Sequence, residues 1–205
     1  MSLFPMFLKL EGRPVVVVGG GRVAEGKISG LLEAGARLRV VAPVVTPKIA
    51  ESARLAQVRW SAKTFAPEDL DGAVLAIAAT SAPGVNEAVF HAAEAREILC
   101  NAVDDVQHCH FYYGAVVHRG DLQIAISTNG KSPALAQRLR QELEMQFSSQ
   151  YEAWLQRLGA VREALRRADS DSESTKQLLH EMASPQMFEA FVRETAARPR
   201  GQGTT

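Results

Sequence analysis

The chain has 205 residues with 23 basic and 23 acidic side chains, so its formal net charge is zero at pH 7. This length can bury a full core with room for a smaller second domain, and the charge balance creates no field that would recruit nucleic acid or an anionic membrane. No apolar run approaches the roughly 18 residues that span a bilayer, and the two cysteines form no CxxC pair, so we expect a cytoplasmic protein.

The first ten residues are rich in apolar side chains. They contain one late lysine and no small-residue cleavage site, so we do not interpret them as a signal peptide. The apolar side chains predict instead a segment that packs on the sheet formed by the following residues. These side chains are Leu3, Phe4, Met6, Phe7 and Leu8.

Residues 15–24 have the pattern of a dinucleotide-binding turn. Four valines at 15–18, typical of a parallel strand buried on both faces, run into Gly19-Gly20-Gly21-Arg22-Val23-Ala24, a G-x-G-x-x-A motif. The first glycine of the motif allows a tight turn and the second lets backbone N–H groups approach a pyrophosphate. The small Ala24 lets the next helix pack against the strand. The pattern predicts a nucleotide site; the alternative is a structural glycine turn.

A helix follows the turn and ends at Gly35, a residue suited to the left-handed conformation after a helix. We expect five of its side chains on the buried face: Val23, Ala24, Ile28, Leu31 and Leu32. The next strand, 38–42, completes the strand–turn–helix–strand order that distinguishes a dinucleotide site from an isolated glycine motif.

The second strand ends without the carboxylate that often holds the ribose of NAD. We expect backbone groups near Pro43 and Val44 to hold the ribose; the alternative is a vestigial site. Arg37 and Arg39 lie within the strand rather than just beyond it, which favours NAD over NADP.

Strands and helices continue to alternate up to about residue 101. Thr46-Pro47 predicts a capped helix to about residue 55, and 58–60, 73–79 and 98–101 are apolar strand candidates. A further helix begins after Thr80-Ser81-Ala82. We expect it to bury Val85, Val89, Phe90 and Ala93. This order predicts an α/β fold with an open, doubly wound parallel sheet.

The pattern changes near residue 111. Residues 111–118 and 122–127, joined by Arg119-Gly120-Asp121, predict a β-hairpin. A loop at 128–133 leads into a helix to about 147, and helical patterns continue to 197 with breaks near 169–174 and 184–185. Because a hairpin and a few helices make a poor independent core, we expect them to pack on a second copy of the chain as a homodimer.

Ligands of open α/β sheets bind beyond the carboxyl ends of the strands, which singles out the loops at 19–23, 80–82 and 102–105. Asp104 would then lie beside the nicotinamide, where a carboxylate can take or deliver a proton as hydride moves. The alternative is a solvated or helix-capping aspartate, and Asp105 is its rival.

Two further groups of residues invite a functional interpretation. His108, Cys109 and His110 place two imidazoles on one face of an extended segment and the thiol on the other, so we expect no metal site but surface histidines flanking a core cysteine. Lys131 and Arg138 follow or border a glycine loop and are candidates for contacts with an anionic substrate, as is Arg140; ordinary solvated charges explain the arginines equally well.

Several stretches, in order and without large gaps between residues 4 and 145, resemble one known family. They are 4–7, 18–24 with Lys27, 31–36, 76–80, 101–105 and the run Ile124 to Ala136 that contains Ser-Pro-Ala-Leu-Ala. The chain is similar to the precorrin-2 dehydrogenase family, which is the dehydrogenase/ferrochelatase module of sirohaem synthase and its stand-alone relatives.

The resemblance implies a domain organisation: an NAD-binding Rossmann domain at 1–112, a dimerisation segment at 113–147, a helical domain at 148–197 and a flexible tail at 198–205. It implies NAD-dependent oxidation of precorrin-2 to sirohydrochlorin by a homodimer, with Fe²⁺ as a further substrate in those members that also make sirohaem. We weigh two alternatives: a non-catalytic NAD-binding sensor or scaffold, and a dehydrogenase of another small substrate.

The resemblance also implies roles for individual residues. Asp104 would be the general base, and Lys131 and Arg138 our candidates for holding the carboxylates of the tetrapyrrole. The cofactor contacts would be Gly19, Gly20, Gly21, Arg22, Val23, Pro43, Val44 and Thr80.

Overall fold

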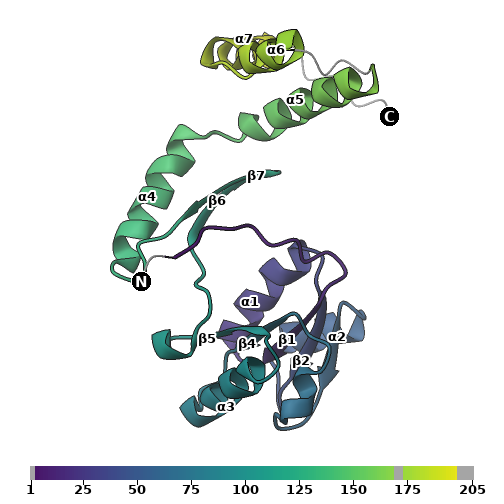
Figure 1. The fold of residues 1–205 in the computed structure, drawn as a ribbon, viewed down its shortest axis with the longest axis vertical. Helices are drawn as coiled ribbons and strands as arrows, with labels where there is room; N and C mark the ends of the chain where they lie inside the picture. The colour runs from purple at the N-terminus through teal and green to yellow at the C-terminus, as the bar shows by residue number, and fades with distance from the viewer. Residues whose placement is uncertain (1–2, 169–172, 198–205) are drawn as a thin grey trace. The chain divides into compact units, whose positions relative to one another are not determined.

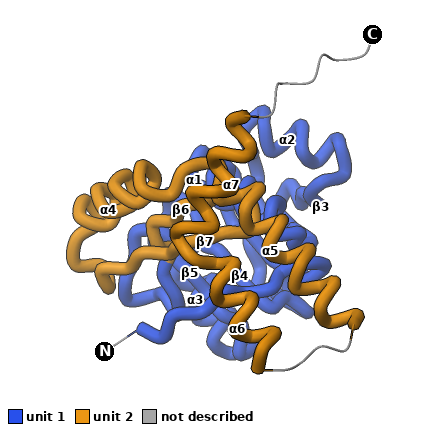
Figure 2. The backbone as a smooth tube through the Cα atoms, turned by 90° about the horizontal axis from the view of Figure 1, so that it is seen from above, with its two compact units in different colours: residues 1–112 blue, residues 113–205 orange. Residues whose placement is uncertain are grey.

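The computed structural model describes residues 3–168 and 173–197, so the predicted flexible tail at 198–205 lies outside the described residues. The chain divides into two compact units, which we call the N-terminal unit (residues 1–112) and the C-terminal unit (residues 113–205) (Figure 2). No helix of the described ranges is long and apolar enough to cross a bilayer.

The N-terminal unit contains a five-stranded, all-parallel sheet with the order β3-β2-β1-β4-β5 (Figure 1). The strands are β1 (Pro14–Val18), β2 (Arg37–Val41), β3 (Val58–Ser61), β4 (Leu75–Ala78) and β5 (Leu99–Ala102). The helices are α1 (Arg22–Glu33), α2 (Pro47–Arg54) and α3 (Pro83–Glu94), with short 3₁₀ turns η1 (Pro67–Leu70) and η2 (Val106–His108). The predicted doubly wound α/β fold is confirmed.

The central strand β1 separates two hydrophobic cores, one on each face of the sheet. Val15 and Val17 pack with α1 and α2 residues such as Ile28, whereas Val16 and Val18 pack with Val89 and the rest of α3. All four valines are at most 2% exposed, as expected of a parallel strand covered on both sides. Because β1 lies between β2 and β4, the chain reverses its direction of winding there, and ligands of such sheets bind at this switch point.

Two predictions of buried helix residues in this unit are wrong. Val23 is 50% exposed and Val85 36%, because both lie in the first helical turn, beyond the carboxyl ends of the strands. Leu32 is partly buried and packs against the core, on the predicted face of α1. The segment before β1 does not pack on the sheet either: Phe4 is 80% exposed and Phe7 67%, since helices already cover both faces.

The C-terminal unit begins with an antiparallel hairpin of β6 (Ala115–Arg119) and β7 (Leu122–Ile126), which confirms the predicted hairpin. Four helices follow: α4 (Pro133–Gln146), α5 (Gln150–Arg167), α6 (Glu173–Met182) and α7 (Pro185–Ala197). Helix α5 packs on α7 through Trp154 and Phe191, whose ring centroids are 5.1 Å apart. The division of this unit at residue 147, and its role in dimerisation, stay predictions.

Candidate functional site

A cavity of about 600 Å³ opens at the carboxyl ends of the strands, within the N-terminal unit. It is lined by the loops that follow β1, β2, β3, β4 and β5. Every residue predicted to contact the cofactor lines it: Gly19, Gly20, Gly21, Arg22, Val23, Pro43, Val44 and Thr80. Asp104 lines it as well. The cavity therefore lies at the switch point where the fold class expects a ligand.

Three lining residues were missed from the sequence, Thr64, Phe65 and Val85, whereas Ser81 and Val103 lie in the predicted loops at 80–82 and 102–105. Thr64 and Phe65 follow β3, so the rule that ligands meet the carboxyl ends of the strands would have found them if applied to that strand as well. Val85 was predicted as a core residue because its apolar side chain fits the buried-face pattern of α3. Its position in the first turn of the helix places it at the cavity instead.

The structure requires or accepts glycine at positions 19, 20 and 21 for three different reasons. Gly19 has φ +128°, in the left-handed region that favours glycine, and its N–H donates to the Val41 carbonyl at 3.0 Å. A Cβ on Gly20 would lie only 2.1 Å from the Val44 carbonyl oxygen, so this position must be glycine for the two loops to meet. A Cβ on Gly21 would have no atom within 4 Å, so Gly21 leaves space at the start of α1.

The N-terminus of α1 offers unpaired donors to the cavity. The first helical bond runs from the Glu25 N–H to the Gly21 carbonyl at 3.0 Å, which leaves the N–H groups of the first turn without helical acceptors. Gly21, the residue before the helix, has no side chain to cap them. Together with the positive end of the helix dipole, these donors suit a phosphate, and Arg22 is the one cationic side chain among the described lining residues.

The loop after β2 is anchored from three sides. The Thr46 N–H donates to the Gly20 carbonyl at 2.9 Å, and the Thr46 hydroxyl donates to the Glu25 carboxylate at 2.7 Å. The Trp60 indole N–H donates to the Ala42 carbonyl at 2.9 Å. Pro43 and Val44, between these anchors, carry neither an acidic nor a basic side chain to the cavity.

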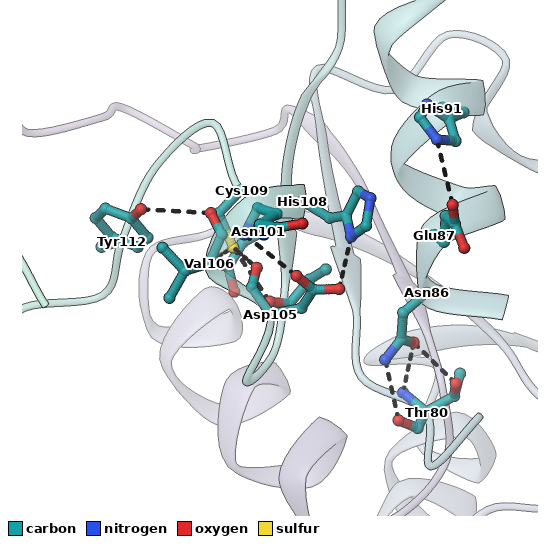
Figure 3. Close-up of polar contacts among 12 residues, drawn as sticks. Thr80, Asn86, Glu87, His91, Asn101, Asp105, Val106, His108, Cys109 and Tyr112 are labelled. Carbon is teal, nitrogen blue, oxygen red and sulfur yellow. Dashed lines mark hydrogen bonds and ion pairs between the residues drawn. The ribbon is translucent and has the colours of Figure 1, made fainter. Parts of the chain in front are cut away.

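The loop after β4 is held by an amide that sequence reasoning missed. Asn86, only 6% exposed, accepts hydrogen bonds from the Thr80 N–H (3.1 Å) and hydroxyl (2.8 Å) and donates to the Thr80 carbonyl (3.2 Å) (Figure 3). A buried polar side chain that satisfies one residue so completely positions that residue. Asn86 thus fixes Thr80 at the wall of the cavity.

The two neighbouring aspartates have different surroundings. Asp104 is exposed at the cavity and has φ +62°, a conformation that aspartate tolerates better than most residues. Lys27 of α1 is half-buried; burial lowers the pKa of its amine, and the charge of Asp104 partly opposes this. Asp105 instead contacts the His108 ring at 2.6 Å, a hydrogen bond that lowers the pKa of the Asp105 carboxyl, and it does not line the cavity.

The remaining candidates lie elsewhere. The His108 and His110 rings both contact Phe90, so they share a side as predicted, but the core thiol is Cys100 rather than the half-buried Cys109. Lys131 and Arg138 belong to the C-terminal unit. Arg138 forms an ion pair with Glu142 at 3.1 Å, and their role as substrate contacts stays a prediction. Arg140 pairs with Glu144 on the same helix.

Comparison with known families gives two matches that are consecutive along the chain. A family described as putative NAD(P)-binding matches residues 6–115, and a family described as sirohaem biosynthesis protein, central, matches residues 119–146. The first of these covers more than half of the chain and includes every element of the cavity.

Curated relatives include siroheme synthase 3 of Aeromonas hydrophila, 40% identical over 166 residues, and siroheme synthase 1 of Serratia proteamaculans, 42% identical over 144 residues. The matches cover 81% and 70% of this chain but only 36% and 30% of those synthases, so the chain spans about a third of their length. Among solved structures, SirC, a precorrin-2 dehydrogenase, is 31% identical with a TM-score of 0.81, and the match covers 95% of this chain and 96% of SirC.

Proposed function

The chain belongs to the precorrin-2 dehydrogenase family, and on that premise we propose that it oxidises precorrin-2 to sirohydrochlorin with NAD⁺. The observation that carries the proposal is the likeness to SirC over nearly the whole of both chains, which includes the two units and the cavity. We also propose a second reaction to be tested, the insertion of Fe²⁺ into sirohydrochlorin.

The residues at the cavity fit a dinucleotide. The open space at Gly21 and the unpaired N–H groups of the first turn of α1 suit its diphosphate, with Arg22 beside them. Pro43 and Val44 would contact the adenosine ribose through backbone groups. Because no basic side chain lines that part of the cavity among the described residues, we propose NAD rather than NADP as the cofactor.

The reaction removes a hydride and a proton from precorrin-2. Bound NAD⁺ supplies the hydride acceptor. The Asp104 carboxylate, at the end of β5 and exposed to the cavity, takes the proton. Thr80, fixed by Asn86, forms the wall of the cavity beyond β4.

Precorrin-2 carries several carboxylates, and basic side chains would hold them. Lys131 and Arg138 are our candidates. Lys131→Ala is expected to raise the apparent KM for precorrin-2, whereas Lys176→Ala, which removes an exposed lysine of α6, serves as a matched control. An unchanged KM in Lys131→Ala would remove Lys131 from the substrate site.

The decisive experiment incubates the protein anaerobically with precorrin-2 and NAD⁺ and follows NADH and sirohydrochlorin by absorbance. Asp104→Asn is expected to lose about 10²–10⁴-fold in turnover while NAD⁺ still binds, the range for a lost general base. Asp105→Asn, the neighbouring carboxylate that contacts His108, should retain turnover within a few-fold. Binding of NAD⁺ without turnover by the unchanged protein would point to a sensor. Oxidation of a small alcohol or hydroxy acid, but not of precorrin-2, would point to a different dehydrogenase.

Two extensions use the same preparation. Fe²⁺ or Co²⁺ added after dehydrogenation shows, by the spectrum of the product, whether metal insertion follows. Calorimetry compares the affinities of the protein for NAD⁺ and NADP⁺. Because no basic side chain lines the cavity beside Pro43 and Val44 among the described residues, we expect NAD⁺ to bind more tightly.

We also propose that the protein is a homodimer. Phe4, Met6 and Phe7 are 80%, 59% and 67% exposed, an apolar surface that a second copy of the chain would cover. Light scattering at micromolar concentration tests this, and a mass equal to one chain would contradict it.

A further inference from the structure

Three potential metal ligands meet on the surface of the N-terminal unit. Glu87 and His91 lie one turn apart on α3, and His108 lies on η2 (Figure 3). Their ligand atoms all lie within 4.8 Å of one another. None of the three is among the described residues that line the cavity, so the cluster is separate from the proposed cofactor site.

A buried aromatic ring holds the two imidazoles in place. Phe90, 8% exposed, contacts the His91 ring at a centroid distance of 5.6 Å and the His108 ring at 5.1 Å. The two imidazoles are themselves 5.7 Å apart and nearly perpendicular. The packing around Phe90 therefore brings together two histidines that are 17 residues apart in the sequence.

Each histidine has one ring nitrogen occupied by a carboxylate. Asp105 contacts Nδ1 of His108 at 2.6 Å, and Glu94 contacts Nδ1 of His91 at 3.3 Å. Nε2 of His91 faces the Glu87 carboxylate at 3.8 Å. A carboxylate on one imidazole nitrogen fixes the tautomer and leaves the other nitrogen as an acceptor, the usual arrangement around metal-bound histidines.

The charges favour a cation at this position. Three carboxylates, those of Glu87, Glu94 and Asp105, face the two imidazoles. An ion pair network at the surface is the simpler explanation of such a cluster. Such a network accounts for the same contacts, so metal binding by the protein decides between the two explanations.

We propose that Glu87, His91 and His108 bind one divalent ion of the zinc class, with a water molecule as the fourth ligand. Two imidazoles and one carboxylate form a recurrent ligand set of open zinc sites, whereas Mg²⁺ and Ca²⁺ prefer all-oxygen ligands. Zinc–ligand distances of about 2.0–2.1 Å put tetrahedral ligand atoms about 3.4 Å apart. The ligand atoms are now 3.8 Å apart between the Glu87 carboxylate and His91 Nε2 and at most 4.8 Å apart within the set, and the side chains of Glu87 and His91 are more than half exposed.

The test is metal binding by the full chain without an affinity tag, after removal of metal with a chelator. Isothermal titration with Zn²⁺ should give one site per chain, and Co²⁺ at the same site should give a visible absorption band that Zn²⁺ abolishes. His91→Ala and His108→Ala should each weaken Zn²⁺ binding by at least about 100-fold. Asp105→Asn, which loosens His108 without removing a ligand, should weaken it by about 10–100-fold.

His180→Ala, an exposed histidine of α6, is the matched control and should bind Zn²⁺ like the unchanged protein. A circular dichroism melt of each variant shows whether it folds, and Glu87→Gln gives a second, milder variant that should also lose Zn²⁺ affinity. Absence of a saturable Zn²⁺ site, or binding unaffected in both His91→Ala and His108→Ala, would overturn the inference. Neither result would bear on dehydrogenation, because the readout is the metal alone.

Discussion

Gly20 offers the sharpest test of how the cofactor turn is built. In Gly20→Ala the new Cβ would lie 2.1 Å from the Val44 carbonyl oxygen and 2.9 Å from the Val45 Cα, whereas real Cβ atoms essentially never approach closer than 3.0 Å. The neighbouring backbone must therefore move by about 0.9 Å. No flexible side chain can absorb the shift at Val44, because the clashing atom belongs to the backbone.

The cost of this substitution follows from how firmly both loops are anchored. Thr46 bonds to Gly20 itself, and Trp60 bonds to Ala42 just before the clash. Overpacking of this kind costs about 1–3 kcal/mol, and the double anchoring places Gly20→Ala at about 2–3 kcal/mol. Because Gly20 and Val44 both line the cavity, we also expect NAD⁺ to bind at least about tenfold more weakly.

Urea unfolding measures the first effect and calorimetric titration with NAD⁺ the second. Gly26→Ala is the matched control, since it adds the same methyl group within α1 where no atom lies within 4 Å of the new Cβ. It should stabilise the protein by about 0.5–1 kcal/mol through helix propensity. A Gly20→Ala protein with an unfolding free energy within about 0.5 kcal/mol of the unchanged chain would refute the steric reasoning.

Two further predictions concern buried polar groups. Asn86→Leu leaves the Thr80 N–H and carbonyl without their partner, so urea unfolding should show a loss of about 1–3 kcal/mol; an unchanged midpoint would mean that water replaces the amide. Burial raises the pKa of the Cys100 thiol to about 12, so in a Cys109→Ser variant at pH 8 a thiol reagent should modify no cysteine until denaturant is added. Rapid labelling of the native variant would show that the Cys100 strand opens.

Local patterns in the sequence were sufficient to predict the strands and helices around the proposed cofactor site. Four valines specified β1 because a strand covered on both faces has no polar side to place. Thr46-Pro47 specified the start of α2, where the Thr46 hydroxyl accepts from the Ile49 N–H as a capping residue does. Gly35 follows the end of α1 and has φ +73°, the left-handed conformation predicted for it.

Patterns of apolar residues failed where a helix extends beyond the sheet. Helical periodicity shows which side of a helix is apolar, but not how far along its axis the partner surface reaches. Val23 and Val85 share the inward-facing pattern of their helices yet lie past the ends of the strands, where they meet the cavity. The apolar residues around Phe4 and Phe7 likewise have no sheet face left to cover in one chain.

The sequence by itself determined the fold class, the glycine turn and the place of the cavity, because strand, turn and helix signals are carried by neighbouring residues. Only the tertiary structure decided that Gly20, a position that the G-x-G-x-x-A motif leaves free, must be glycine, since Val44 approaches it from another loop. It alone brought His91 to His108 beside Phe90. Contacts between distant segments depend on how the elements pack, so the periodicity of a single segment cannot predict them.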